Sequence, residues 1–156
     1  MAAAKTLQLS VSEYFFRLST ESVRLYSNKV LEHTSLGKVI DSRAERANDL
    51  ADSYDADDMR EHLRIIPSDG VVALDFTILA TSAASLEKAA ALLAEALGRP
   101  LVVEDALSLI MFDLVVERNA TELFTKLGLT AEEADAYRVC LKRKDTNVIR
   151  FPPERT

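Results

Sequence analysis

The sequence predicts a predominantly helical protein with a minor β element, an α+β fold within a single domain of 156 residues. Three observations lead to this prediction. Apolar residues recur at helical spacing over most of the chain, and one segment, 72–79, alternates with period two. The four glycines are isolated, each at a plausible end of a segment. A chain of this length can bury a core without metals or disulfides.

Residues 1–66 are predicted to form a helical hairpin. Leu7, Leu9 and Val11 alternate with polar residues, a period-two pattern too short to assign a strand. Ser10 and Glu13 have capping-box spacing, which predicts that an amphipathic helix of about twenty residues begins at Ser10.

A second amphipathic run extends from Leu36 to Tyr54, after the break "EHTSLG". The short connection predicts that the two helices pack antiparallel. Their narrow apolar stripes fit either a two-helix arm or a face shared with another subunit. A short helix is expected around 59–65.

The turn "PSDG" (67–70) separates this region from a packed body over 71–144. Within the body, "VVALDFTILA" predicts a strand and "SAASLEKAAALLAEALG" a helix that stops at Gly98. A short helix ending at Gly128 follows, and then a helix capped by Thr130 and Glu133 that runs to about Lys144. Residues 145–156 are predicted to be an extended tail, because a Pro–Pro pair excludes helix.

The most apolar stretch, "GRPLVVEDALSLIMFDLVV" (98–116), leaves two alternatives open. A central buried helix is favoured by Pro100 at its entry and by Glu104 and Asp105 near its start, where the helix dipole favours acids. Its β-branched residues instead favour two strands, which would complete a βαββα sheet layer over 71–127. Asp113 fits neither alternative well.

Composition bears on location and partners. The net charge of −6 disfavours nucleic acid, since phosphate contacts supply most non-specific affinity. The single cysteine, Cys140, indicates a reducing compartment. The chain has no run of 18 apolar residues and no signal-peptide pattern at its start. We therefore expect a soluble cytoplasmic protein with no membrane partner.

Two segments are similar to DNA-binding motifs. The strand–helix–helix order of 71–118 resembles the ribbon-helix-helix family of small dimeric repressors, which pair one strand from each subunit and read DNA with the exposed strand face. Here that face would present Ala73, Asp75, Thr77 and Leu79, without a basic residue. Residues 122–138 have helix-turn-helix spacing, but Phe124 is bulky for the close crossing, so a plain helix–glycine–helix corner is preferred.

The sequence offers little for catalysis or metal binding. Asp58 and His62 lie four residues apart within an acidic run, but the run lacks a calcium-loop glycine and a second histidine. Cys140 has no histidine near it in sequence, and no phosphate-binding glycine loop is present. We predict no catalytic residue, no cofactor and no metal, and hence no enzyme.

These observations favour a non-catalytic protein-binding or assembly protein, such as an adaptor, that contacts another protein or a second copy of itself through the helical hairpin and the extended tail. The alternative is a dimeric ribbon-helix-helix-type regulator, antitoxin-like in kind. The predicted contact residues are aromatic and apolar on the hairpin and basic or apolar near the carboxyl end: Tyr14, Phe15, Leu25, Tyr26, Arg138, Lys142, Arg143, Lys144, Ile149 and Phe151.

Overall fold

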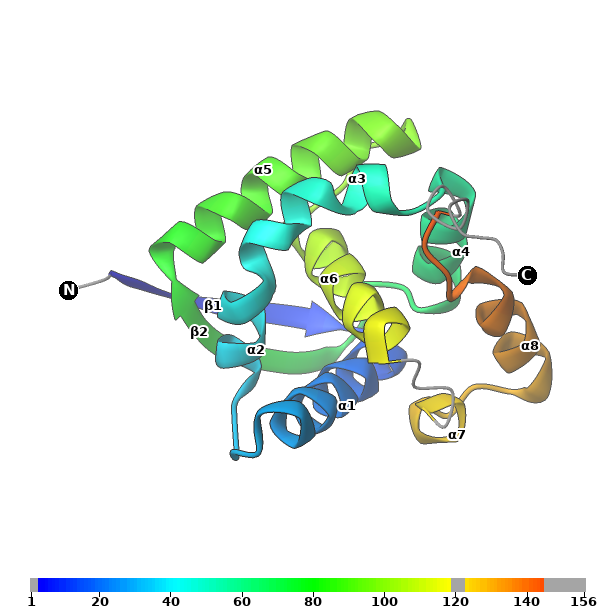
Figure 1. The fold of residues 1–156 in the computed structure, drawn as a ribbon, viewed down its shortest axis with the longest axis horizontal. Coiled ribbons are helices and arrows are strands. Elements are labelled where there is room, and N and C mark those ends of the chain that lie inside the picture. The colour runs from blue at the N-terminus through cyan, green and yellow to red at the C-terminus, as the bar shows by residue number, and fades with distance from the viewer. Residues whose placement is uncertain (1–2, 119–122, 145–156) are drawn as a thin grey trace, which may run out of the picture.

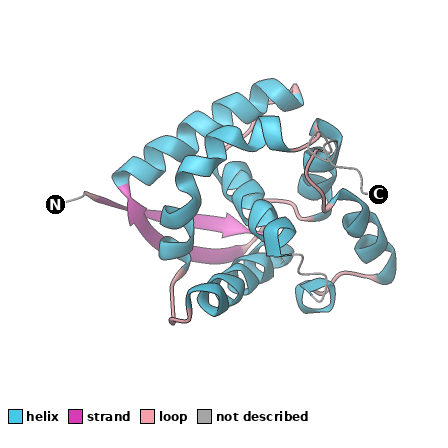
Figure 2. Ribbon diagram, in the orientation of Figure 1, coloured by secondary structure: helices cyan, strands magenta, loops and turns pink. Residues whose placement is uncertain are grey.

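The computed structural model describes residues 3–118 and 123–144. Most of the described residues are helical, and one small two-stranded sheet lies at one side, which confirms the predicted fold class (Figures 1 and 2). The elements in chain order are β1 (Ala4–Val11), α1 (Glu13–Val30), α2 (Leu36–Arg43), the 3₁₀ helix η1 (Ala44–Asp49), α3 (Leu50–Ser53), α4 (Ala56–Ile65), β2 (Val72–Leu79), α5 (Ala80–Leu97), α6 (Val103–Arg118), α7 (Leu123–Leu127) and α8 (Ala131–Cys140).

Helix α6 is the central element, with α1, α4 and α5 packed around it (Figure 1). Every residue from Ala106 to Val115 is buried. The helical alternative for 98–116 is therefore confirmed, and the two-strand alternative, with its βαββα layer, is wrong. The reason is that this helix is apolar on nearly all sides, so only a central position covers it. Asp105 fixes its start, because its carboxylate accepts the Val102 N–H at 3.0 Å.

The sheet brings together a segment near the start of the chain and a segment near its middle. Strand β1 pairs antiparallel with β2, from Ala4 opposite Leu79 to Val11 opposite Val72. The predicted helix start at Ser10 is wrong, because Ser10 belongs to β1 and the hydroxyl of Ser12 caps α1 instead. Pairing within one chain also differs from the ribbon-helix-helix arrangement, in which the strands come from two subunits.

The prediction of one continuous second helix over 36–54 is wrong. Three shorter helices, α2, η1 and α3, follow one another there. Helix α2 is held against the outer edge of β2. A Cβ on Gly37 would lie 2.0 Å from the Thr77 carbonyl oxygen, and the Asp41 carboxylate accepts the Leu79 N–H at 2.9 Å. The tighter 3₁₀ turns of η1 then carry the chain along α5.

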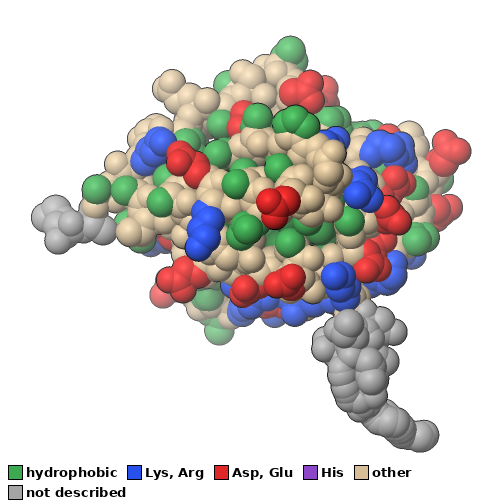
Figure 3. Space-filling view, turned by 90° about the horizontal axis from the view of Figure 1, so that it is seen from above, with side chains coloured by type: hydrophobic (Ala, Val, Ile, Leu, Met, Phe, Trp, Pro, Cys, Tyr) green, Lys and Arg blue, Asp and Glu red, His purple; other side chains and the backbone are tan. Residues whose placement is uncertain are grey.

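Helix α5 begins directly after β2 and ends at Gly98, as predicted. It forms one side of the molecule, where hydrophobic side chains are scattered among charged and other polar ones (Figure 3). Within the described residues, no helix is both long enough and apolar enough to cross a membrane.

Helices α7 and α8 also follow the predicted helix–glycine–helix corner, except at the end of α8. Gly128, with a φ of +82°, joins α7 to α8, and Thr130 and Glu133 form the capping box. Helix α8 ends at Cys140 rather than near Lys144. The chain then turns back, and the Lys144 N–H donates to the Ser53 carbonyl at 2.8 Å. The predicted extended tail lies outside the described residues.

Candidate functional site

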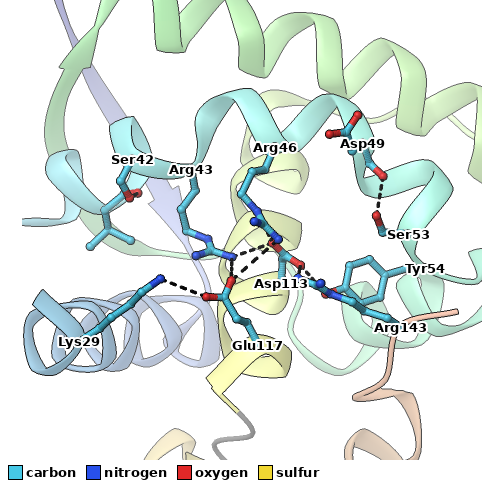
Figure 4. A network of polar contacts seen from close by, with 11 residues as sticks. Lys29, Ser42, Arg43, Arg46, Asp49, Ser53, Tyr54, Asp113, Glu117 and Arg143 are labelled. Atoms are coloured by element: carbon cyan, nitrogen blue, oxygen red, sulfur yellow. Dashed lines mark hydrogen bonds and ion pairs between the residues drawn. The ribbon is translucent and has the colours of Figure 1, made fainter. Parts of the chain in front are cut away.

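A buried carboxylate on α6, that of Asp113, organises a cluster of polar contacts (Figure 4). Asp113 and Glu117 lie four residues apart on α6, so both side chains leave the same helix face. Arg43 and Arg46, three residues apart at the junction of α2 and η1, face them. Together with Tyr54, Arg143 and Lys29, these residues are called the arginine network below.

Both oxygens of Asp113 are fully used. Oδ2 accepts from Arg43 Nη2 at 2.7 Å and from Arg46 Nε at 3.3 Å. Oδ1 accepts from Arg143 Nη2 at 2.9 Å and from the Tyr54 hydroxyl. Donors from three separate segments therefore meet on one carboxylate.

Glu117 extends the network toward α1. Its Oε1 accepts from Arg43 Nη2 at 2.9 Å, and its Oε2 accepts from Lys29 Nζ at 3.1 Å. The Arg43 side chain, only 4% exposed, thus bridges the two carboxylates. Its Nε is buried and has no hydrogen-bond partner among the described residues, an uncommon condition in native proteins.

The surroundings hold both carboxylates in their charged form. Burial raises the pKa of Asp113, but the hydrogen bonds from Tyr54 and Arg43 and the charges of Arg43 and Arg143 lower it further, so the net shift is downward. The pKa of Glu117 is likewise lowered, because Arg43 and Lys29 outweigh its burial. Burial and the contact with Asp113 raise the pKa of Tyr54, which keeps its hydroxyl a donor.

Charges in the arginine network do not cancel. Four cations, Lys29, Arg43, Arg46 and Arg143, face two ionised carboxylates, which leaves a surplus of two positive charges. The side chain of Arg46 is 48% exposed, and those of Arg143 and Lys29 are similarly exposed. The surplus charge therefore reaches the surface of a chain whose net charge is −6.

Two clefts open beside Arg46. The Ser53 cleft, of about 150 Å³, is lined by Arg46, Asp49, Leu50, Ser53 and Asp113. The Tyr26 cleft, of about 250 Å³, is lined by Tyr26, Lys29, Val30, Ser42, Arg43, Arg46 and Glu117. Arg46 lines both, so its guanidinium stands between two hollows of the surface.

A second buried polar side chain, that of His62, lies in the core outside the arginine network. The ring of His62 is bound on both sides, with Nε2 2.7 Å from the Ser108 hydroxyl and Nδ1 3.0 Å from the Tyr137 hydroxyl. Burial lowers the pKa of His62 to about 3. The ring does not join Asp58, whose carboxylate binds Lys142 at 3.0 Å. No cluster that could hold a metal ion occurs among the residues that the structure describes.

The predicted contact residues lie in different surroundings. Phe15 is 1% exposed and Leu25 is also buried, so this stripe faces the core of its own chain, which corrects its placement on a contact surface. Tyr14 is half-buried and donates to Glu133 at 2.7 Å, beside an open cleft of about 630 Å³. Arg143 belongs to the arginine network, and Tyr26 lines a cleft beside it. Ile149 and Phe151 lie outside the described residues.

The remaining basic residues of the prediction are exposed or half-buried near α8. Arg138 pairs with Asp135 and lies over the Phe124 ring, 4.9 Å from its centroid. Lys142 pairs with Asp58, and Lys144 is tied to Ser53 through its backbone. Cys140 is buried, and burial raises the pKa of its thiol to about 12.

Sequence reasoning missed most of the arginine network. Two signals pointed to it: an aspartate within the most apolar segment, which needs partners when buried, and two arginines three residues apart. The pairing itself could not be read from the sequence, since Arg43 lies seventy positions before Asp113.

Comparisons of the chain with protein-family models, with curated proteins and with solved structures found no match.

Proposed function

We propose that this is a non-catalytic binding protein that holds an acidic segment of a partner protein at the arginine network. The observation that carries the proposal is the surplus of two positive charges in the arginine network, whose exposed Arg46 lines two clefts. Arginine suits this role because its guanidinium binds a carboxylate through two parallel hydrogen bonds.

An acidic peptide fits this surface better than a nucleic acid does. A nucleic acid presents a long row of phosphates and needs a row of cations along it. Here the surplus charge is confined to one cluster, and Asp49 lines the Ser53 cleft beside it. A short segment with one or two carboxylates needs only such a local cluster of cations.

We propose a non-catalytic protein because its buried reactive side chains already have partners or are shielded from solvent. Asp113 is saturated by four donors, His62 is buried between two hydroxyls, and Cys140 is buried with a raised thiol pKa. Each of these groups already stabilises the fold. Binding would use the exposed guanidinium groups of Arg46 and Arg143 and leave the buried carboxylate in place.

The test is a titration of the protein with a fluorescent glutamate-rich peptide, with a single-stranded DNA oligonucleotide of equal charge as the competing probe. Arg46→Gln removes one exposed charge, while Asp113 keeps Arg43, Arg143 and Tyr54. We expect this variant to bind the peptide about tenfold more weakly, the effect of losing one charge-assisted hydrogen bond.

Arg60→Gln is the matched control, because Arg60 is 44% exposed, pairs with Asp57 on α4 and lies outside the network. Equal peptide affinity of wild type and Arg46→Gln would refute the site. Tighter binding of the oligonucleotide than of the peptide would refute an acidic protein segment as the ligand.

A further inference from the structure

We infer that the outer edge of β1 pairs with β1 of a second copy of the chain, so that two copies form one continuous four-stranded sheet. This inference is independent of the arginine network. It starts from an asymmetry between the two edges of the sheet: the edge of β2 is covered by α2, while the edge of β1 is exposed.

The hydrogen-bond pattern shows which backbone groups face outward. Ala80 N–H donates to the Ala3 carbonyl across the sheet, whereas Leu79 N–H donates sideways to Asp41. Bonded and non-bonded pairs alternate in an antiparallel ladder. From the register, the backbone groups of β1 that face away from β2 are those of Ala4, Thr6, Gln8 and Ser10.

These four residues carry free pairing groups. Within residues 3–118 and 123–144, no hydrogen bond to their backbone is present on the open edge. On β2, the equivalent edge is blocked, because Gly37 lies against the Thr77 carbonyl and Asp41 occupies the Leu79 N–H. An exposed strand edge of this length is a template for strand addition.

The edge of β1 is complementary to itself. When two copies of β1 lie antiparallel about a two-fold axis at Leu7, Ala4 faces Ser10 of the second copy and Thr6 faces its Gln8. All four outward residues of each strand are then paired. Leu7 lies opposite Leu7, which brings together side chains that are only half-buried in one chain.

Electrostatics do not oppose pairing at this edge. Two chains of net charge −6 repel each other, but the four outward residues are uncharged. Lys5, which pairs with Glu87 of its own chain, would face Leu9 of the second copy. The two Lys5 residues would stand about 14 Å apart at ~3.4 Å per residue, beyond the screening length of physiological salt.

The first test is the molar mass of the protein in solution, measured by light scattering after size exclusion. We expect twice the chain mass of 17.3 kDa for the wild type and the single-chain mass for Gln8→Pro. Proline removes an outward N–H of β1 without touching the ladder with β2. Gln8→Ala keeps that N–H and is expected to remain dimeric. A monomeric wild type, or a Gln8→Pro protein that stays dimeric, would overturn the inference.

The second test does not depend on a proline variant that folds. In the expected register the two Leu7 Cα atoms lie about 4.5 Å apart, within disulfide range, so Leu7→Cys should cross-link on mild oxidation. Leu9→Cys is the matched control: it is half-buried on the same face, but its two copies lie about 14 Å apart. Cross-linking of both variants to the same extent, or of neither, would rule out this pairing.

Discussion

At the scale of single residues, burial acts on two titratable side chains with opposite results, because their hydrogen-bond partners differ. Burial opposes the charge on Asp113, but cationic donors outweigh it and the carboxylate stays ionised with a lowered pKa. Burial also opposes the charge on His62, and there the partners are the neutral hydroxyls of Ser108 and Tyr137. The imidazole therefore stays neutral, with its pKa lowered to about 3.

His62 makes stability depend on pH. In the unfolded chain its imidazole has a pKa near ~6.5 and takes up a proton below that pH, whereas in the fold it does not. The unfolded state then binds more protons, so stability falls as pH falls from about 6.5 toward 3, with a slope approaching ~1.4 kcal/mol per pH unit. Urea denaturation between pH 7 and pH 5 measures this slope above the range in which carboxylates titrate.

His62→Gln should lose the slope, although it is less stable than wild type at pH 7. His33→Gln is the matched control, because His33 is exposed and its replacement should leave the slope intact. An unchanged slope in His62→Gln would mean that other groups set the pH dependence.

At the scale of elements, backbone contacts between helix and strand set where the chain bends. Helix α2 approaches β2 so closely that only a glycine fits at position 37. Asp41, one turn further along, holds the Leu79 N–H at the end of β2. With α2 tied to this edge, the chain continues through η1 to α3 rather than as one straight helix.

Gly37→Ala should therefore destabilise the protein, although alanine is the better helix former. The added Cβ would lie 2.0 Å from the Thr77 carbonyl oxygen, so α2 must move away from β2. We expect a loss of about 1–3 kcal/mol in the free energy of unfolding, the usual effect of overpacking. Lys38→Ala, at the exposed neighbouring position, should change it by less than about 0.5 kcal/mol. A neutral or stabilising Gly37→Ala would show that the helix is free to shift.

At the scale of the whole molecule, one core connects both halves of the chain. The buried apolar cluster includes Val11 of β1, Leu18 of α1, Leu109 of α6 and Tyr137 of α8. The turn at 67–70 lies between α4 and β2, and a Cβ on Gly70 would lie 2.4 Å from the Val11 carbonyl oxygen. The helical front of the chain and the body behind it thus share their packing.

Unfolding should accordingly be a single cooperative transition. Far-UV circular dichroism reports the helices. Tyrosine fluorescence reports the surroundings of the four tyrosines, of which Tyr54 and Tyr137 are buried, since the chain has no tryptophan. We expect the two denaturation curves to coincide at a fixed protein concentration. Two separate midpoints would show instead that residues 1–66 and 71–144 unfold as independent units.

Local hydrophobic pattern determined some elements of this fold, and contacts between distant segments determined the others. Hydrophobic pattern alone was sufficient for β2, for α5 and for the burial of α6, because each of these elements follows from side chains within a few turns of one another. Contacts between distant segments decided the rest. β1 is a strand because β2 lies beside it, Phe15 faces inward because α1 packs on α6, and Asp113 is charged because arginines from two other segments reach it. Burial can be read from local sequence, whereas the partner of a strand edge or of a buried charge is set by the packing of the whole chain.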